Sequence, residues 1–261
     1  MKRKHEVLID AEACIGCGLC QGDCPMANIE VADGAARPVS QRCIMCGHCV
    51  AICPKGAVSM TGFDEEPVEL GGRGASARVG ADELALALKA RRSIRQFEPR
   101  PVETDVVGRI IEAGRVTPTG GNAQEVEFVV LQEKLPEVER VAVRLFRRLF
   151  PFAKRFDPSV ARVTIDEHFF FKGAPVAVAV VAKDQVDASL AAANMALMAE
   201  ACGLGVLYSG FFATAARFSP TLRRMLGLHR GQRVVAALVL GHPAVRYRRT
   251  APKEPASMRM L

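Results

Sequence analysis

Apolar residues at helical spacing dominate the second part of the chain. Their spacing predicts one helix that is capped by Asp82 and another that begins at Thr104, and Gly114 is expected to end the second of these. A run of spaced valines and leucines predicts another helix that ends near Pro151. Residues 189–201 are rich in Ala and Met and are apolar around most of the helix circumference, which is typical of a central, buried helix.

Strand signals are interleaved with these helices. The apolar run from Val176 to Ala182 predicts a strand buried on both faces, and further strands are expected over Val126–Leu131 and Val234–Leu240. Ser219 followed by Pro220 is the pattern of a helix start. This mixture indicates an α/β or α+β domain over residues 82–261.

The first part of the chain has a different pattern. Residues 1–62 consist of short segments between turns and hold eight of the nine cysteines, in two visibly similar copies. Residues 63–81 are rich in Gly, Pro and Ser and show little periodicity, as linkers do. We therefore predict a small domain over residues 1–62, a linker over 63–81 and a second domain over 82–261.

Composition excludes several classes of protein. Of the 261 residues, 49% are hydrophobic and 24% are charged, which is ordinary for a globular chain and argues against disorder and collagen-like arrays. No apolar stretch reaches the ~18 residues of a membrane span. The basic start is not followed by the apolar segment of a secretory signal. These features predict a soluble cytoplasmic protein with no membrane partner.

The net charge of +7 is unevenly distributed. Residues 1–60 hold six basic and six acidic residues, so the whole surplus lies in the second part of the chain. The bases there are scattered, and no nucleic-acid motif accompanies them. We expect an anionic cofactor or substrate and no nucleic acid.

The cysteines follow one spacing twice, C-x2-C-x2-C-x3-C-P. Clustered cysteines without a signal peptide point to metal or redox chemistry rather than to disulfides. Zinc is the alternative, but zinc sites use two separated cysteine pairs rather than four cysteines crowded together. The motif cysteines are Cys14, Cys17, Cys20 and Cys24 in the first copy, and Cys43, Cys46, Cys49 and Cys53 in the second.

This segment resembles the two-cluster ferredoxins of bacteria. The resemblance implies two [4Fe–4S] clusters, in which the fourth cysteine of each copy binds the cluster of the other copy. The first cluster would take Cys14, Cys17, Cys20 and Cys53, and the second Cys43, Cys46, Cys49 and Cys24. Such a domain transfers single electrons. The ninth cysteine, Cys202, is expected to be a small core residue.

Polar motifs of the second domain are compatible with a flavin. Arg91, Arg92, Ser93 and Arg95 follow the first helix of that domain, where arginines and a hydroxyl can hold a phosphate, although they also suit a plain cationic helix end. A Gly-rich polar loop with Asn122 and Gln124 lies between a helix and a strand. Further along come the turn Ser209–Gly210 and a basic C-terminal segment with Arg248 and Arg249.

Taken in order, these motifs resemble the FMN-dependent nitroreductase family over roughly residues 82–253. The resemblance implies an α+β fold with a central mixed sheet, FMN and a domain-swapped homodimer with flavin sites at its interface. It also implies flavin contacts at Arg91, Arg92, Ser93, Arg95, Asn122, Gln124, Ser209 and Gly210, and a C-terminal phosphate anchor at Arg249 together with Arg248. The family often has Gln-Pro-Trp after the Asn loop, whereas this chain has Gln124, Glu125 and Val126.

The combined expectation is an oxidoreductase in which two clusters relay electrons to FMN, which reduces an electrophilic nitroaromatic, quinone or enone. We assign no catalytic side chain, because the cofactor supplies the chemistry. Ferredoxin and NAD(P)H both remain as donors. The alternatives are an NAD(P)H-oxidising protein that exports electrons through its clusters, and a non-catalytic redox sensor or carrier. Phenylalanines at 146–156 and 169–171 fit either a lid over the flavin or plain core.

Overall fold

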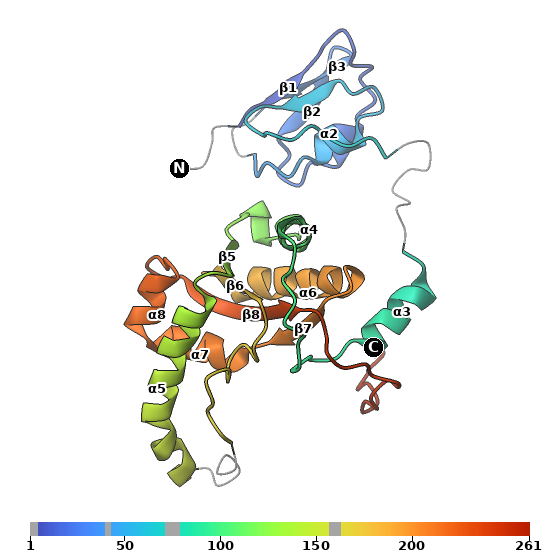
Figure 1. The fold of residues 1–261 in the computed structure, drawn as a ribbon. Coiled ribbons are helices and arrows are strands. Elements are labelled where there is room, and N and C mark those ends of the chain that lie inside the picture. The colour runs from blue at the N-terminus through green and yellow to red at the C-terminus, as the bar shows by residue number, and fades with distance from the viewer. Residues whose placement is uncertain (1–4, 40–42, 71–78, 157–162) are drawn as a thin grey trace. The chain divides into compact units, whose positions relative to one another are not determined.

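The computed structural model describes residues 5–39, 43–70, 79–156 and 163–261, with no side-chain description for 150–156. The chain forms two compact units, which are described separately below (Figure 1). One comprises Met1–Arg78 with Gly120–Ala123, and the other comprises Val79–Thr119 with Gln124–Leu261. Residues 71–78 of the predicted linker lie outside the described residues, and the domain limits at 62 and 82 stay a prediction.

The described part of the N-terminal unit contains two small antiparallel strand pairs and two short helices (Figure 1). Strand β1 (Val7–Ile9) pairs antiparallel with β4 (Val58–Met60), and β2 (Ile29–Ala32) pairs antiparallel with β3 (Ala35–Pro38). Its small core consists of buried aliphatic residues and two of the motif cysteines. These core residues are Cys20, Ile29, Ala36, Cys49 and Val58.

The internal duplication is visible in the two helices of this unit. Helix α1 (Leu19–Gly22) follows Gly18, and α2 (His48–Ile52) follows Gly47. The two glycines have φ angles of 78° and 73°, a left-handed conformation that other residues adopt only at an energetic cost. Each glycine thereby turns the chain so that the third cysteine of its motif lies at the start of a helix.

The second unit is organised around one four-stranded sheet in the order β5-β6-β8-β7, and its neighbouring strands all pair antiparallel. The strands are β5 (Glu127–Leu131), β6 (Val176–Ala182), β7 (Gly205–Tyr208) and β8 (Arg233–Gly241). A parallel component enters only as an isolated bridge between Ser93 and Val206 among the described residues. The α+β class is confirmed.

Helices cover both faces of this sheet (Figure 1). Helices α4 and α6 pack together on one face, while α5, α7 and α8 pack on the other. The helices are α3 (Ala81–Ala90), α4 (Thr104–Arg115), α5 (Leu135–Phe156), α6 (Gln185–Ala201), α7 (Gly210–Phe218) and α8 (Pro220–Met225). Among the described residues, no helix combines the length and the apolar character needed to cross a membrane.

Strand β6 shows why the sheet can be buried on both sides. Side chains alternate across a strand, and in β6 both alternate sets are apolar. Val176, Val178 and Val180 pack toward α4 and α6, whereas Ala177 and Ala179 pack toward α5 and α7. All seven residues are buried, as the apolar run predicted.

Several predicted boundaries were wrong. Asp82 lies in the first turn of α3 rather than capping it, and α4 continues past Gly114 to Arg115. Gly114 does not end the helix because it is a contact point, where an added Cβ would collide with Phe128. Helix α5 continues past Pro151 to Phe156. Strand β7 and helix α7 were not predicted.

The phenylalanines at 169–171 belong to the core, since their exposed fractions are 8%, 1% and 0%. Buried Glu139 holds this turn: its Oε1 accepts hydrogen bonds from the backbone N–H groups of Phe170 and Phe171 at 3.0 and 2.7 Å. Burial raises the pKa of the Glu139 carboxyl, and these two hydrogen bonds act in the opposite direction. The lid interpretation is therefore wrong for these three residues; the side chains of 150–156 lie outside the described set.

Candidate cofactor sites

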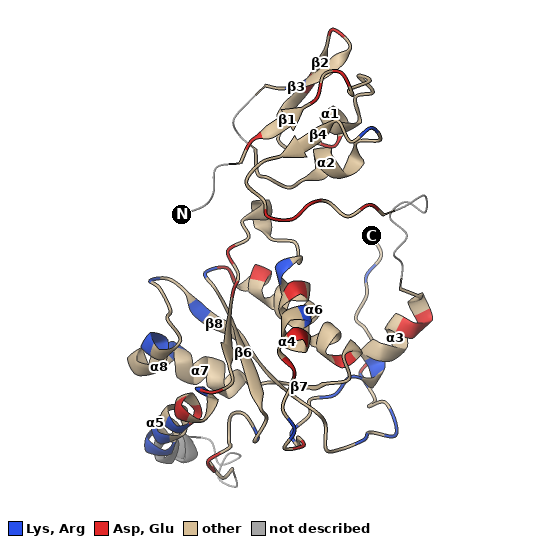
Figure 2. Ribbon diagram, turned by 45° about the horizontal axis from the view of Figure 1, so that its top comes forward, with Lys and Arg blue, Asp and Glu red and all other residues tan. Residues whose placement is uncertain are grey.

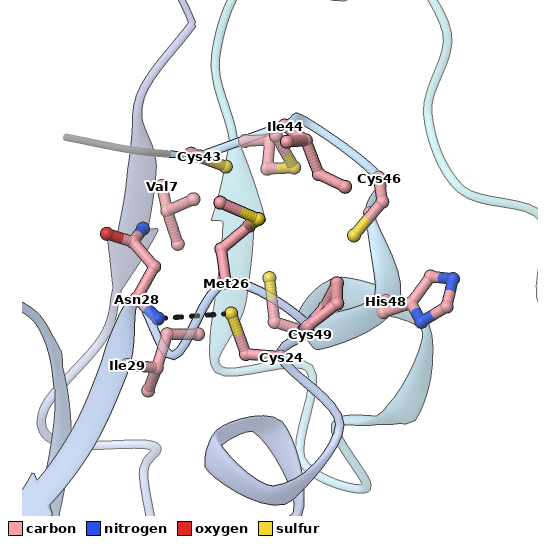
Figure 3. A pocket seen from close by; sticks show the side chains of 13 residues that line it. Val7, Cys24, Met26, Asn28, Ile29, Cys43, Ile44, Cys46, His48 and Cys49 are labelled. Atoms are coloured by element: carbon pink, nitrogen blue, oxygen red, sulfur yellow. Dashed lines mark hydrogen bonds between the residues drawn. The ribbon is translucent and has the colours of Figure 1, made fainter. Parts of the chain in front are cut away.

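Four cysteines from both copies of the motif surround one pocket in the N-terminal unit. The pocket is lined by Cys43, Cys46 and Cys49 of the second copy and by Cys24 of the first, and Figure 3 shows their sulfur atoms around it. The space within it, including the part that is open to solvent, is about 350 Å³. We call it the Cys24 pocket.

The remaining four motif cysteines surround a second pocket. It is lined by Cys14, Cys17 and Cys20 of the first copy and by Cys53 of the second, and its space, again including the part open to solvent, is about 340 Å³. We call it the Cys53 pocket. The two pockets match in size and exchange their fourth cysteine, which is the arrangement of a two-cluster ferredoxin.

The donor set of both pockets fits an iron–sulfur cluster. Cluster iron is held by thiolates, and backbone N–H groups directed at sulfur stabilise the negative charge. Here Asn28 and Met45 donate their backbone N–H to the sulfurs of Cys24 and Cys43, at 3.2 and 3.3 Å. In the other pocket Ala57 and Ala36 do the same for Cys53 and Cys14, at 3.3 and 3.4 Å.

The thiol pKa values reflect the same surroundings. The backbone hydrogen bonds from Ala36 and Gly16 lower the pKa of Cys14, whereas burial raises the pKa of Cys20 and of Cys49. Cys20 and Cys49 are the third cysteines of their motifs, so the two copies behave alike. Within the described residues, no three His, Cys, Asp or Glu side chains are close enough to hold a single metal ion.

The end of α3 brings two arginines of the second unit together. Arg91 is the residue that ends the helix, and Arg92 Nη1 donates to the Arg91 carbonyl oxygen at 2.5 Å. Arg91 Nη1 and Arg92 Nη2 are both buried and have no hydrogen-bond partner among the described residues. Buried unpaired guanidinium nitrogens are costly, and a bound anion such as a phosphate would satisfy them.

The segment after these arginines is attached to the edge of the sheet. Ile94 donates its backbone N–H to the Val206 carbonyl oxygen at 2.9 Å. Gly205 makes this approach possible, because a Cβ at that position would lie 2.6 Å from the Ile94 side chain. Further on, Glu98 donates to the His242 carbonyl oxygen at 2.8 Å. These contacts fix where Ser93 and the two arginines lie.

The charge of Arg91 acts on two neighbours that the sequence did not single out. Burial raises the pKa of the Glu200 carboxyl and of the Tyr208 hydroxyl, and the positive charge of Arg91 acts against both shifts. The Tyr208 hydroxyl donates to the Ala192 carbonyl oxygen at 2.9 Å. Helix α6 and strand β7 therefore contribute to the surroundings of Arg91.

The polar loop before β5 adopts an unusual backbone. Asn122 ends a short 3-10 turn (Gly120–Asn122), and both Asn122 and Gln124 have positive φ angles, of 52° and 50°. Non-glycine residues in this conformation are uncommon and are often found at functional sites. At the start of the loop, Asn194 of α6 donates to the Thr117 hydroxyl at 2.8 Å.

Ser209 and Gly210 lie where β7 passes into α7. Ser209 is buried and donates its backbone N–H to the Ala237 carbonyl oxygen at 2.8 Å, and Gly210 is the first residue of the helix. The first N–H groups of a helix have no acceptor within it, so this turn presents free donors. Arg95, Arg248 and Arg249 are exposed, and the last two lie on the C-terminal segment after β8.

Sequence comparisons agree with both halves of this description. Residues 6–54 match the 4Fe-4S dicluster domain, and residues 88–242 match the Nitroreductase family. The chain is 28% identical over 179 residues to an FMN reductase (NAD(P)H) of Bacillus subtilis, covering 63% of this chain and 68% of that protein. It is 25% identical over 181 residues to a protein of Methanothermobacter thermautotrophicus named provisionally as an NADH dehydrogenase/NAD(P)H nitroreductase, covering 64% of this chain and 81% of that protein.

Solved structures share the fold of the second unit. A nitroreductase from Desulfitobacterium hafniense with bound FMN superposes with a TM-score of 0.57 at 19% identity, over 68% of this chain and 98% of that one. A nitroreductase from Bacteroides fragilis with bound FMN gives a TM-score of 0.55 at 21% identity, over 68% of this chain and 99% of that one. Because the matched family region spans more than half of the 261 residues, this chain belongs to the nitroreductase family, and it carries a 4Fe-4S dicluster domain at its N-terminal end.

Proposed function

We propose that this chain is an iron–sulfur flavoprotein oxidoreductase with two [4Fe–4S] clusters and one FMN. When bound, the clusters supply one-electron transfer and the flavin supplies transfer of a hydride equivalent to a small molecule of the nitroaromatic, quinone or enone type. The observation that carries the proposal is that one chain combines two four-cysteine pockets with a nitroreductase fold.

The residues of the chain have distinct tasks in this proposal. The eight motif cysteines hold the clusters, and Arg91 and Arg92 pair with the FMN phosphate through their buried, unpartnered nitrogens. Ser93 and the exposed Arg95 contribute from the segment attached to β7, and Asn122 and Gln124 contribute from the polar loop. Gly210 presents its backbone N–H group at the start of α7 to the flavin ring, and Ser209, whose own N–H is bonded to Ala237, holds the turn in place. Arg248 and Arg249 reach the phosphate from the C-terminal segment.

An anaerobic absorbance titration tests the direction of electron flow. We expect NADH and NADPH to leave the flavin band unchanged, and reduced ferredoxin to bleach clusters and flavin together, because electrons enter through the cysteine pockets. The protein should contain FMN and about eight irons per chain. A preparation with zinc and no acid-labile sulfide would refute the cluster assignment.

The names of the relatives favour a second candidate. The Bacillus subtilis relative is named as an NAD(P)H-dependent FMN reductase. In a chain of that kind NAD(P)H would reduce the flavin, and the clusters would export electrons to a carrier protein. Prompt bleaching of the flavin band by NADH or NADPH in the same titration would establish this candidate in place of the first.

We further propose a homodimer, because the described residues of its unit leave every residue of α3 unburied. No residue of this ten-residue helix is buried, and Leu84, Leu86 and Leu88 are 41%, 63% and 52% exposed. Isolated helices shorter than about 12 residues are marginal in water, so α3 needs a surface to pack on. Figure 2 shows the acidic first turn of α3 in red and its basic end in blue, with uncharged residues between them.

The double variant Leu84→Glu/Leu88→Glu should therefore dissociate the dimer. Charges on the apolar side of α3 would have to be buried without partners at the interface. Sedimentation should show about twice the chain mass of 28.1 kDa for the parent protein, and the single-chain mass for the variant. The control is Lys89→Glu, which changes the charge of the same helix but removes no apolar surface. A parent protein that sediments as a single chain would contradict the dimer.

A further inference from the structure

The internal duplication places equivalent residues beside the two cysteine pockets. Four positions after the fourth cysteine of each copy, Asn28 and Ala57 donate their backbone N–H to the sulfurs of Cys24 and Cys53, at 3.2 and 3.3 Å. Both residues are buried, with exposed fractions of 3% and 4%. The backbone surroundings of the two fourth cysteines are therefore nearly the same.

The side chains at this position differ. Ala57 has only a methyl group, whereas Asn28 carries a carboxamide and lines the Cys24 pocket. The Asn28 Oδ1 atom is buried and has no hydrogen-bond partner in the described part of the chain. Leaving a buried polar atom unpaired costs about 1–3 kcal/mol, so alanine would be the less costly residue for folding alone.

The orientation of the amide gives it an electrostatic effect. Figure 3 shows the side-chain nitrogen of Asn28 on the side of Cys43 and its oxygen directed away from it. The nitrogen is the positive end of the amide dipole. Reduction adds one electron to a cluster that is already held by negative thiolates, and a positive dipole end nearby stabilises that added charge.

We propose that Asn28 tunes the Cys24 pocket to the higher reduction potential, so that the cluster in this pocket accepts an electron before the one in the Cys53 pocket. The inference rests on the proposed cluster binding. The N-terminal unit then has two electron-transfer sites with unequal reduction potentials. Asn28 sets the difference through its amide dipole and does not itself bind the cluster.

The other polar groups near the pockets do not distinguish them in the same way. Each pocket receives two backbone N–H to sulfur bonds of 3.2–3.4 Å, one to its fourth cysteine and one to another. In the Cys53 pocket Gly16 adds an interaction with Cys14 that is weaker than that of Ala36. Lys55 lines the Cys53 pocket at the position that Met26 has in the other copy, but it is exposed and its charge is screened by water and salt. His48 lies 3.3 Å from Asp23, and both of these side chains are also largely solvent-exposed.

The test is a redox titration of the full-length holoprotein with dithionite, followed by electron paramagnetic resonance. The parent protein should show two separate one-electron steps. Asn28→Ala gives the first copy the residue that the second copy has. In this variant the equilibrium constant for reduction in the higher-potential step should fall about tenfold, which lowers that potential by about 59 mV, and the other step should not shift. Asn28→Leu keeps the side-chain volume but removes the dipole, so it should give the same shift. It serves as the test if the smaller alanine destabilises the fold.

A control variant at Lys55 and the iron content of the Asn28 variants decide how the shift is interpreted. Lys55→Met should shift either step by less than twofold in equilibrium constant, because its charge is exposed. Full iron content in Asn28→Ala and Asn28→Leu without a shift, or an equal shift of both steps, would overturn the role of Asn28. A parent protein without iron and sulfide would overturn the proposed function itself and this inference with it.

Discussion

Replacing Arg91 and Arg92 together by alanine is expected to weaken FMN binding by at least about a hundredfold. Each arginine has a buried nitrogen without a partner among the described residues, and a charge-assisted hydrogen bond contributes about 1.5–3 kcal/mol. Two such bonds amount to about 3–6 kcal/mol, and about 1.4 kcal/mol corresponds to a factor of ten in affinity. Quenching of FMN fluorescence on titration with flavin-free protein measures the change.

The matched control is Lys89→Ala, which removes a positive charge from the last turn of the same helix. It should keep the parent affinity for FMN, because the effect requires the buried nitrogens rather than the general charge of the helix end. Iron content should be unchanged in both variants. If the double variant binds FMN as tightly as the parent protein, Arg91 and Arg92 do not hold the phosphate.

Replacing Cys43 and Cys46 together by alanine is expected to remove one cluster and leave the other. Both sulfurs line the Cys24 pocket, and a cubane cannot be held by the two thiolates that remain. The iron content should fall from about eight to about four per chain, and one of the two paramagnetic signals of the reduced protein should disappear. Bound FMN should be retained, because Arg91 and Arg92, which are proposed to hold its phosphate, lie in the other unit.

Cys202→Ala serves as the control for this experiment. Cys202 follows α6 and lies outside both cysteine pockets, so the variant should keep its full iron content. If Cys202→Ala lost as much iron as the Cys43 and Cys46 double variant, the loss would reflect general instability. Unchanged iron in the Cys43 and Cys46 variant would show that the Cys24 pocket holds no cluster.

The strongest elements of the fold were predictable from local pattern. Strand β6 has the predicted bounds Val176–Ala182, and α8 begins at Pro220 after a Ser219 side chain that accepts from the Leu222 N–H at 3.2 Å. In both cases neighbouring residues contain the whole signal. Strand β7 was missed because its four residues are defined by pairing with β8, which is distant in sequence.

Long-range packing also explains why Gly114 did not end α4. The helix packs closely against Phe128 at this residue, and burial of its apolar face outweighs the cost of about 1 kcal/mol for a glycine in a helix. Pro151 likewise lies within α5 rather than at its end. The phenylalanines at 169–171 are also buried through contacts with residues of other elements.

The sequence by itself determined the class of chemistry, because the cysteine spacing and the order of the polar motifs are local and specific. The ferredoxin resemblance also implied that Cys24 shares a cluster with three cysteines of the other copy, and the Cys24 pocket agrees with it. Only the tertiary structure decided that the Arg91 and Arg92 nitrogens are buried without partners among the described residues. It also exposed the difference between Asn28 and Ala57, two buried residues in equivalent places. Burial and pairing depend on segments far apart in the chain, and no local pattern of residues encodes them.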